Sequence, residues 1–406
     1  MADALSPAEL YDRLRRGEPL TLLDVRNRDE FETWRIDAPE TVQTPYAEFL
    51  SAKVRDGVPQ LAESLDLEEP VVAVCPRGEA SDRVADLLRD AGVDAVNLEG
   101  GMNGWARVYV AREIEGSDET VVQYERPSSG CLSYLVVSGD EAAVVDPLRA
   151  FADRYVEDAR ERGAELRYAV DTHVHADHVS GIREVAEASE AEPVLPSGAR
   201  ERGLAFDAKP VEDGDELRVG ETALTAVHAP GHTSEMTVYR LGNTLFSADT
   251  LFLDGVGRPD LEREARRASE RADEGDGAPQ ESSSGEPASA DPATGSAGAS
   301  ELAGDLYGTL HERLLALPET TIVAPGHVHV RTPRADDGTF TARLATVRES
   351  VPLLELDRER FVERVAGDLP PRPANYEEIV AVNLGRREVE EETAFELELG
   401  PNNCAV

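Results

Sequence analysis

The chain has 406 residues and a formal net charge of −40, from 81 acidic and 41 basic residues. This excess of carboxylate repels nucleic acid and anionic membrane surfaces, so we expect neither as a partner. Lys53 and Lys209 are its only lysines. An acidic surface nearly free of lysine is typical of proteins kept soluble in concentrated salt, where screening relieves self-repulsion. We therefore expect a halophilic source.

The length predicts two domains. Hydrophobic residues make up 40% of the chain and fall in regular patterns, which argues against an acidic disordered protein. The first residues are polar and resemble no signal peptide, and no apolar run is long enough to cross a bilayer. The three cysteines Cys75, Cys131 and Cys404 are too few and too scattered for a disulfide scaffold. We expect a cytoplasmic protein, either a monomer or a homo-oligomer.

The first 112 residues alternate helix and strand patterns. Residues 6–9, Ser-Pro-Ala-Glu, form a capping box that begins a helix. Apolar runs at 21–25, 71–74 and 94–98 predict strands. Residues 1–112 are therefore expected to form an α/β domain with a largely parallel sheet.

Cys75 lies between a predicted strand and a predicted helix. The backbone N–H groups and the positive end of a helix dipole favour a thiolate or persulfide anion at such a position. A buried cysteine that only packs is equally compatible with this spacing. The residues themselves leave both interpretations open.

The first domain resembles the rhodanese family of sulfurtransferases over nearly its whole length. The matching residues are Leu23-Asp24-Val25-Arg26, Glu30-Phe31, the loop at Cys75, and Glu99-Gly100-Gly101 followed by Trp105. The resemblance implies that Cys75 carries sulfane sulfur as a persulfide, so that the domain is an accessory sulfurtransferase. The family's usual arginine five residues after the cysteine is replaced by Ala80, and Arg77 is the candidate substitute.

A second pattern begins near residue 118 and carries all eight histidines, which lie between residues 173 and 329. Successive apolar strands end in tight turns that present imidazole or carboxylate groups. Such ligands without thiolate suit iron, zinc or manganese, and their repetition predicts a metal site. The candidate ligands are His173, His175, Asp177, His178, His232, Asp249 and His327.

Residues 118–406 resemble the metallo-β-lactamase fold, an αββα sandwich with its metal site at one edge. All seven positions of the family's binuclear pattern are filled, so the sequence leaves one metal ion or two open. In the hydroxyacylglutathione hydrolase branch, two ions such as Zn²⁺ act on a thiolester. In the persulfide dioxygenase branch, one Fe²⁺ binds at the residues matching His173, His232 and Asp249. This triad leaves one face of the iron open for O₂ and substrate.

Four candidate ligands have a different role in each branch. In the hydrolase they complete the second metal site, whereas in the dioxygenase they contact and orient the iron ligands. Asp177 is also a candidate catalytic residue. These four are His175, Asp177, His178 and His327.

The segment Gly257-Arg258-Pro259-Asp260 favours the dioxygenase branch, because the hydrolase form has an aromatic residue near the position of Asp260. The resemblance implies a persulfide (sulfur) dioxygenase that oxidises a low-molecular-weight thiol persulfide with O₂ to sulfite and thiol. Arg258 and Asp260 are then candidate substrate-binding residues.

The C-terminal tail also resembles persulfide dioxygenases fused to rhodanese, at residues 373–376, 383–385 and 399–404. Glutathione-using relatives have tyrosine at the position of His329, so the identity of the thiol carrier stays open.

The remaining features have simpler interpretations. Residues 262–302 are rich in Glu, Ala, Ser, Gly, Asp and Pro, which predicts a disordered acidic insertion. His228 and His311 are expected to be structural, and Cys131 to be packed. Cys404 is expected either beside the metal site or inert.

Overall fold

The computed structural model describes residues 4–262, 265, 292–329, 331–367, 369–400 and 402–405. The chain divides into two compact units. The first comprises residues 1–110 with 126–129 and 399–401, and the second comprises the rest. The first unit's main segment ends at Val110, close to the domain boundary that the sequence predicts at 112–118.

The first unit is a four-stranded sheet with the order β2-β1-β3-β4, in which every pairing is parallel. The α/β class predicted for this unit is confirmed. Its strands are β1 (Thr21–Asp24), β2 (Glu40–Gln43), β3 (Val71–Val74) and β4 (Ala95–Asn97). Its helices are α1 (Pro7–Arg15), α2 (Arg28–Thr33), α3 (Tyr46–Val54), α4 (Val58–Leu65), α5 (Glu79–Asp90) and α6 (Gly101–Trp105).

Alternating side chains of β1 and β3 build a core on each face of this sheet. Leu22, Val72 and Val74 belong to one apolar cluster, and Leu23 and Val71 to the other. The N-cap predicted at Ser6 is present at α1, where the Ser6 hydroxyl accepts a hydrogen bond of 3.2 Å from the Glu9 amide, while the Glu9 carboxylate pairs with Arg13. In this unit the secondary structure that the sequence predicts and the burial of its apolar side chains are therefore consistent with the same fold.

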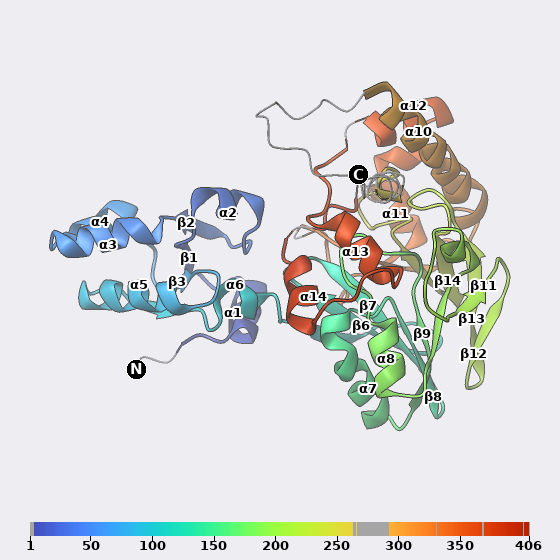
Figure 1. The fold of residues 1–406 in the computed structure, drawn as a ribbon, viewed down its shortest axis with the longest axis horizontal. Coiled ribbons are helices and arrows are strands. Elements are labelled where there is room, and N and C mark those ends of the chain that lie inside the picture. Colours follow the sequence, from blue (N-terminus) through green and yellow to red (C-terminus); the bar gives the residue numbers. More distant parts are fainter. Residues whose placement is uncertain are drawn as a thin grey trace, which may run out of the picture. The chain divides into compact units, whose positions relative to one another are not determined.

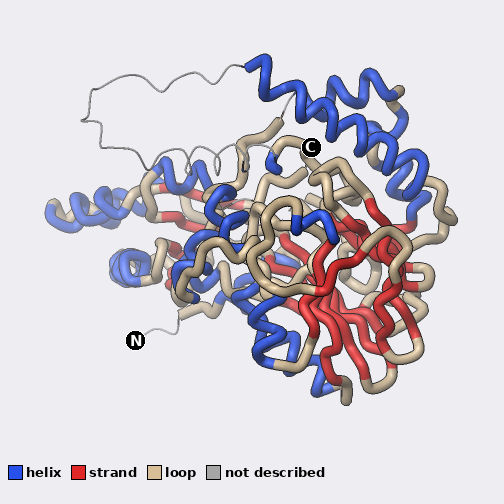
Figure 2. The backbone as a smooth tube through the Cα atoms, turned by 45° about the vertical axis from the view of Figure 1, so that its right-hand side comes forward, coloured by secondary structure: helices blue, strands red, loops and turns tan. Residues whose placement is uncertain are grey.

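The second unit contains two sheets (Figures 1 and 2). One has seven strands in the order β11-β10-β9-β8-β7-β6-β5, and the other has six in the order β12-β13-β14-β15-β16-β17. The first sheet's strands are β5 (Val110–Glu113), β6 (Thr120–Arg126), β7 (Cys131–Ser138), β8 (Glu141–Val145), β9 (Glu165–Val170), β10 (Glu192–Pro196) and β11 (Lys209–Val211). The second sheet's strands are β12 (Glu216–Val219), β13 (Thr222–His228), β14 (Thr237–Leu241), β15 (Thr244–Ala248), β16 (Ile322–Pro325) and β17 (Ala342–Arg343).

The two sheets share one apolar core, to which Val136 and Val145 contribute from one sheet and Val238 and Leu245 from the other. Figure 2 shows helices outside the strands. Helices α7 (Ala152–Glu161) and α8 (Ile182–Ala188) contact β9 of the seven-stranded sheet. The other helices of the second unit are α10 (Pro292–Gly308), the π-helical turn η3 (Thr309–Leu314), α11 (Leu344–Ser350), α12 (Arg358–Gly367), α13 (Tyr376–Asn383) and α14 (Glu391–Leu397). This arrangement is the metallo-β-lactamase fold expected from the sequence.

The prediction of disorder for residues 262–302 is wrong at its C-terminal end. Helix α10 begins at Pro292, and its Ala299, Ala303 and Leu306 are buried. The composition predicted disorder here because alanine counts as only weakly apolar. Alanine side chains are nevertheless small enough to let a helix pack closely against its neighbours. Most of the predicted insertion lies outside the described residues.

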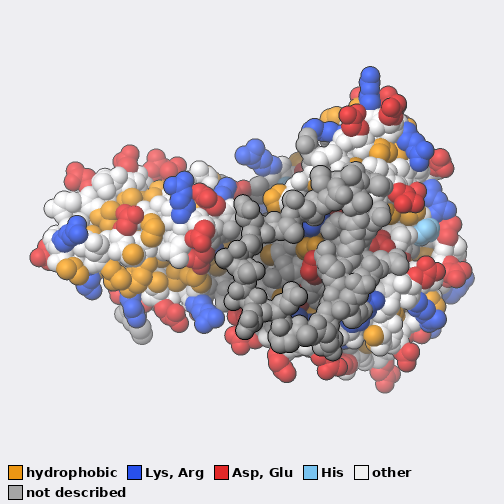
Figure 3. All heavy atoms as spheres, turned by 45° about the horizontal axis from the view of Figure 1, so that its top comes forward, with side chains coloured by type: hydrophobic (Ala, Val, Ile, Leu, Met, Phe, Trp, Pro, Cys, Tyr) orange, Lys and Arg blue, Asp and Glu red, His pale blue; other side chains and the backbone are white. Residues whose placement is uncertain are grey.

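Carboxylate and guanidinium side chains are interspersed over the face shown in Figure 3. The halophilic source inferred from composition stays a prediction. Among the described residues, none of the helices has the length and apolar character needed to span a bilayer.

Leu306 of α10 is fully buried and packs against the backbone of Gly231, beside His232. We predict that Leu306→Ala lowers the free energy of unfolding by about 2–5 kcal/mol, because it leaves a cavity under that loop. The measurement is the shift of the denaturant-unfolding transition. Exposed Glu301 lies on the same helix, and Glu301→Ala is the control, with an expected change within about 0.5 kcal/mol. Equal effects of the two substitutions would show that α10 does not pack there.

Candidate metal centre

The candidate ligands lie where strands of both sheets end. The segment 173–178 follows β9 of the seven-stranded sheet. His232, Asp249 and His327 follow β13, β15 and β16 of the six-stranded sheet. All seven side chains are buried. The fold therefore brings together residues that are up to 154 positions apart in the sequence.

His173, His232 and Asp249 form the first group, whose ligand atoms lie within 4.8 Å of one another. The Asp249 Oδ2 atom is 3.6 Å from His232 Nε2 and 4.0 Å from His173 Nε2. Within the described part of the chain, His173 Nε2 and Asp249 Oδ2 have no hydrogen-bond partner. Buried polar atoms without partners are costly, so these converging atoms fit a bound cation.

Other residues fix both histidine rings of this group through the opposite nitrogen. Thr172 Oγ1 lies 3.0 Å from His173 Nδ1, and the same threonine donates to Asp146 from its amide and its hydroxyl. His232 Nδ1 donates to the Arg258 carbonyl at 2.7 Å. Each contact leaves Nε2 facing Asp249, an arrangement that is usual for metal-binding histidines.

Burial is the largest cause that lowers the pKa of His173 and His232 below the ordinary histidine value. Neighbouring imidazoles lower the pKa of His173 further, while Asp249 partly opposes the shift at His232. Both rings are therefore neutral near pH 7, the state in which imidazole binds metal.

Asp177, His178 and His327 form a second group next to the first. The Asp177 Oδ2 atom is 3.2 Å from His178 Nδ1 and 3.3 Å from His327 Nε2. His327 Nε2 is also 3.2 Å from Asp249 Oδ1, which joins the two groups. Burial alone would lower the pKa of His327, but the carboxylates of Asp249 and Asp177 outweigh it and hold the pKa well above its ordinary value.

His175 makes a further set of contacts. Its Nε2 atom is 3.1 Å from Asp146 Oδ1 and 3.9 Å from Asp171 Oδ1, so this imidazole pairs with two carboxylates. Burial raises the pKa of Asp171 to about 7. The centre of the His175 ring lies 4.1 Å from those of His173 and His178, and its Nδ1 has no partner among the described residues. The role of His175 as a metal ligand stays a prediction.

Asn383 of α13 fixes the backbone of the loop at 173–180. Its amide nitrogen donates to the carbonyls of His175 and His178, and its carbonyl oxygen accepts from the Ser180 amide. The tail motif at 383–385 thus has a positioning role at the metal centre.

Glycine is required at Gly326 beside this centre. A Cβ atom there would lie 2.5 Å from Asp249 Oδ1. Any larger residue would displace the carboxylate that the first and second groups share.

Arg258 and Asp260 pair with each other, and the substrate-binding role expected of them stays a prediction. The Arg258 guanidinium is 1% exposed, pairs with Asp260 at 2.7 Å, and donates to the carbonyls of Pro371 and Asn403. Its donors are thus engaged with the protein, while its own carbonyl accepts from His232. This geometry indicates that Arg258 positions a metal ligand.

Several functional candidates were missed by the sequence patterns. Thr172 and Asp146 hold His173, and the Cys131 thiol lies within 4.8 Å of the Asp177 and His178 ligand atoms. Cys404, which was expected either beside the metal site or inert, lies within 4.8 Å of the Asp177 and His327 ligand atoms. The position of Thr172 directly before the histidine motif was a usable signal. Cys131 carried none, because 46 positions separate it from Asp177 in the sequence.

Cys75 of the first unit is buried at the start of α5, as its sequence position predicts. Its Sγ atom accepts a hydrogen bond from the Gly78 amide at 3.1 Å and lies 3.2 Å from the Ser81 hydroxyl. The single proton of that hydroxyl has a closer acceptor in the Asn97 amide oxygen at 2.7 Å. A backbone amide aimed at the sulfur at a helix N-terminus suits an anionic form of that sulfur.

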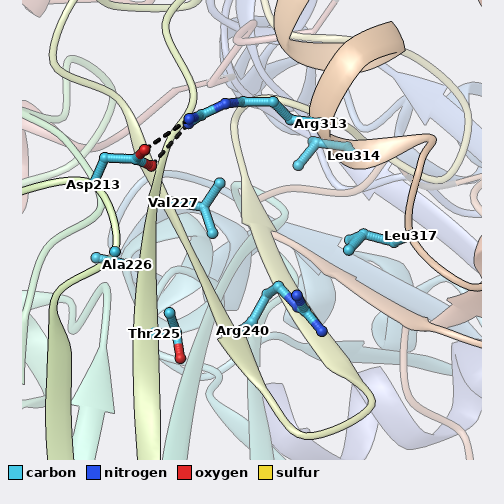
Figure 4. A pocket seen from close by; sticks show the side chains of 9 residues that line it. Asp213, Thr225, Ala226, Val227, Arg240, Arg313, Leu314 and Leu317 are labelled. Carbon is cyan, nitrogen blue, oxygen red and sulfur yellow. Dashed lines mark hydrogen bonds and ion pairs between the residues drawn. The ribbon is translucent and has the colours of Figure 1, made fainter.

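A hollow of about 270 Å³ lies between β13, β14 and η3 (Figure 4). Asp213 and Arg313 form an ion pair of 2.7 Å beside it. Its lining residues are Asp213, Gly214, Thr225, Ala226, Val227, Arg240, Arg313, Leu314 and Leu317. The hollow contains none of the seven candidate ligands, so the metal chemistry belongs elsewhere.

Comparison with known proteins assigns a family to each unit. Residues 6–108 match the Rhodanese-like domain, and residues 127–327 match the Metallo-beta-lactamase superfamily. Human mitochondrial persulfide dioxygenase ETHE1 is 26% identical over 270 residues, which cover 64% of this chain and 86% of that protein. Hydroxyacylglutathione hydrolase of Parasynechococcus marenigrum is 34% identical over 151 residues, which cover 34% of this chain and 60% of that protein.

Solved structures agree with the fold. The crystal structure of ETHE1 from Myxococcus xanthus superimposes with a TM-score of 0.50 at 24% identity, covering 68% of this chain and 100% of that one. A metallo-beta-lactamase from Staphylococcus aureus gives a TM-score of 0.52 at 22% identity, covering 66% and 73%. The chain is thus a rhodanese-like domain followed by a domain of the metallo-β-lactamase superfamily.

Proposed function

We propose that the protein is a persulfide dioxygenase that oxidises a low-molecular-weight thiol persulfide at a single Fe²⁺. The observation that carries this proposal is the group of His173, His232 and Asp249. Its two neutral imidazoles and one carboxylate point toward one another, and some of their atoms have no hydrogen-bond partner among the described residues. Two histidines and one carboxylate form the ligand set of non-haem iron oxygenases, which leaves coordination positions open. The likeness to human persulfide dioxygenase supports the same activity.

The overall reaction converts RSSH, O₂ and H₂O into RSH and H₂SO₃, so the outer sulfur gains three oxygen atoms and the inner sulfur leaves as thiol. Bound iron would supply the activation of O₂. His173, His232 and Asp249 would hold that iron, and burial of their side chains excludes bulk water from the protein side of the site. Thr172 and the Arg258 carbonyl keep the two imidazole rings in place.

Hydrolysis of a thiolester at two metal ions is the second candidate function. The likeness to hydroxyacylglutathione hydrolase and the donor atoms of Asp177, His178 and His327 favour it. It requires a second ion that keeps a position open for water. The number of catalytic ions therefore separates the two functions.

We further propose that the rhodanese-like unit transfers sulfane sulfur through Cys75. The Gly78 amide, which donates to Sγ at the start of α5, supports this role because it would stabilise a thiolate or a persulfide anion. Sulfane sulfur would pass from this cysteine to a small thiol, and the persulfide so formed is the substrate of the iron centre.

The protein reconstituted with Fe²⁺ should consume O₂ and release sulfite in equal amounts when given a small-thiol persulfide. Asp249→Asn should remove an iron ligand and lower both the iron content and the O₂ consumption by more than about 100-fold. Substitution of a residue that only contacts a ligand usually lowers metal affinity or activity by about 10- to 100-fold. Asp254→Asn, at an exposed position, is the control. Absence of O₂ consumption, together with thiolester turnover at two ions per chain, would establish the hydrolase instead.

Thr172→Val should weaken iron binding by about 10- to 100-fold, because it removes the hydroxyl that orients His173. The measurement is the iron dissociation constant from chelator competition. Thr250→Val is the matched control, since Thr250 is also buried and its hydroxyl has no partner among the described residues. Similar affinities of the two variants would mean that the Thr172 contact does not orient the ligand.

Cys75→Ser should abolish sulfur transfer from thiosulfate to a thiol, because serine cannot carry sulfane sulfur. Oxidation of a persulfide supplied directly should stay unchanged. Thiosulfate formation from persulfide is the assay for coupling between the two units, and it should be lost. Unchanged thiosulfate formation would rule that coupling out.

A further inference from the structure

Arg202 and Glu235 form a buried ion pair, and neither residue is a candidate metal ligand. Arg202 Nη1 donates to Glu235 Oε1 at 2.5 Å, and the side chains are 9% and 0% exposed. Burial alone would raise the pKa of Glu235, but Arg202 and the Val174 amide outweigh it and hold the pKa below its ordinary value. A buried ion pair is weak evidence of added stability, so its other contacts indicate its role.

The strand order places this ion pair at the edge of the sandwich that carries the ligands. Strand β10 is parallel to β9, so the chain leaves both strands at the same edge. After β9 it forms the loop at 173–178 (the histidine loop), and after β10 it forms the 3-10 helix η2 (Ser197–Arg200) and reaches Arg202. Glu235 lies in the turn between β13 and β14, three positions after His232. The ion pair therefore joins loops that come from different sheets.

Glu235 also holds the backbone of the histidine loop. Its Oε1 atom accepts a hydrogen bond of 3.0 Å from the amide of Val174, the residue that directly follows His173. On the other side of His173, the Thr172 carbonyl accepts a hydrogen bond of 2.9 Å from the Thr237 amide. The turn that follows one candidate iron ligand thus binds the chain on both sides of another.

Close packing leaves the Glu235 side chain little freedom. A Cβ atom on Gly198 of η2 would lie 2.7 Å from the Glu235 Cβ atom, so the two segments touch without an intervening side chain. The Thr237 hydroxyl donates to the Glu235 carbonyl at 3.2 Å and holds the backbone of the same turn. The Oε1 atom is therefore kept in place for the Val174 amide.

The C-terminal tail holds the other half of the ion pair. Arg386, which directly follows the motif at 383–385, donates to the carbonyls of Arg202 and Gly203. The motif itself holds the histidine loop through Asn383. The contacts therefore close on themselves: the tail holds the loop of Arg202 and the histidine loop, and the ion pair connects these two loops to the turn after His232.

We propose that Arg202 and Glu235 are positioning residues that hold the iron ligands His173 and His232 in a fixed relation to each other. This inference rests on the proposed iron site. Neither residue touches the iron or the substrate, because they act through the Val174 amide. Thr172 and the Arg258 carbonyl orient the imidazole rings, whereas the ion pair fixes the backbone segments from which the rings extend. Residues that support metal ligands in this way affect metal affinity or activity by about 10- to 100-fold.

Asp158 provides a matched control for a purely structural role of the ion pair. Its carboxylate is buried like that of Glu235, pairs with Arg154 at 2.9 Å and accepts from the Tyr124 hydroxyl at 2.8 Å. Of these two carboxylates, Glu235 alone has a partner in the histidine loop among the described residues. Asp158→Ala therefore removes a buried, arginine-paired carboxylate without removing a contact to the histidine loop.

The nitric oxide adduct of Fe²⁺ tests the positioning role, since the rhombicity of its electron paramagnetic resonance signal reports the geometry of the iron ligands. In the full-length protein, Glu235→Ala should change the rhombicity and weaken iron binding by about 10- to 100-fold. Glu235→Gln should restore most of both, because its amide oxygen still accepts from Val174. Asp158→Ala should lower the unfolding temperature and keep the signal. An unchanged signal in Glu235→Ala, or the same change in both alanine variants, would overturn the role.

Hydrogen–deuterium exchange of the metal-free protein tests the contact without iron. The peptide that contains Val174 should exchange slowly in the unmutated protein, faster in Glu235→Ala, and at the unmutated rate in Asp158→Ala. Fast exchange in the unmutated protein would reject the contact even if a variant failed to fold. If the unmutated protein bound no iron, the proposed function would fail. If it oxidised persulfide and Glu235→Ala shared its iron signal, only the positioning role would fail.

Discussion

The buried carboxylates of Asp177 and Asp249 are the constraint on which the second unit depends. Removing an ionised carboxylate from water costs several kcal/mol unless opposite charge and hydrogen bonds replace the lost hydration. Here the imidazoles of His178 and His327 face them at 3.2 to 3.3 Å. Some ligand atoms nevertheless stay without partners among the described residues. The folded chain thus favours the binding of cations at these carboxylates, and metal binding would contribute to its stability.

The sandwich meets this constraint by bringing strand ends together. Strands β9, β13, β15 and β16 each contribute buried apolar residues to the core between the sheets, and the candidate ligands follow where each strand ends. The chain can therefore bury a dense cluster of ionisable groups without interrupting the apolar core between the sheets. Helix α13 supports the same edge through Asn383, whose amide satisfies three backbone groups of the histidine loop.

Sequence patterns predicted the parts that depend on local signals. The strand before Cys75, the capped helix at Ser6 and the seven residues at strand ends all follow from periodicity and turn chemistry. The grouping of those seven residues did not, because it depends on side-chain orientation after the sheets have packed. His175 and His173 are two positions apart, yet one imidazole pairs with Asp146 and the other faces Asp249. The position of Cys131 could not be predicted, since it depends on an isolated backbone bridge between Cys131 and His327 that connects the two sheets.

Arg258 connects the His232 ring to the C-terminal tail. Its carbonyl holds the His232 ring, and its guanidinium binds Asp260 and the carbonyls of Pro371 and Asn403. The Gly-Arg-Pro-Asp segment and the C-terminal tail therefore act together to orient the His232 ring. A lysine at this position could not replace it, because a point charge lacks the fork of donors that spans a carboxylate and two carbonyls.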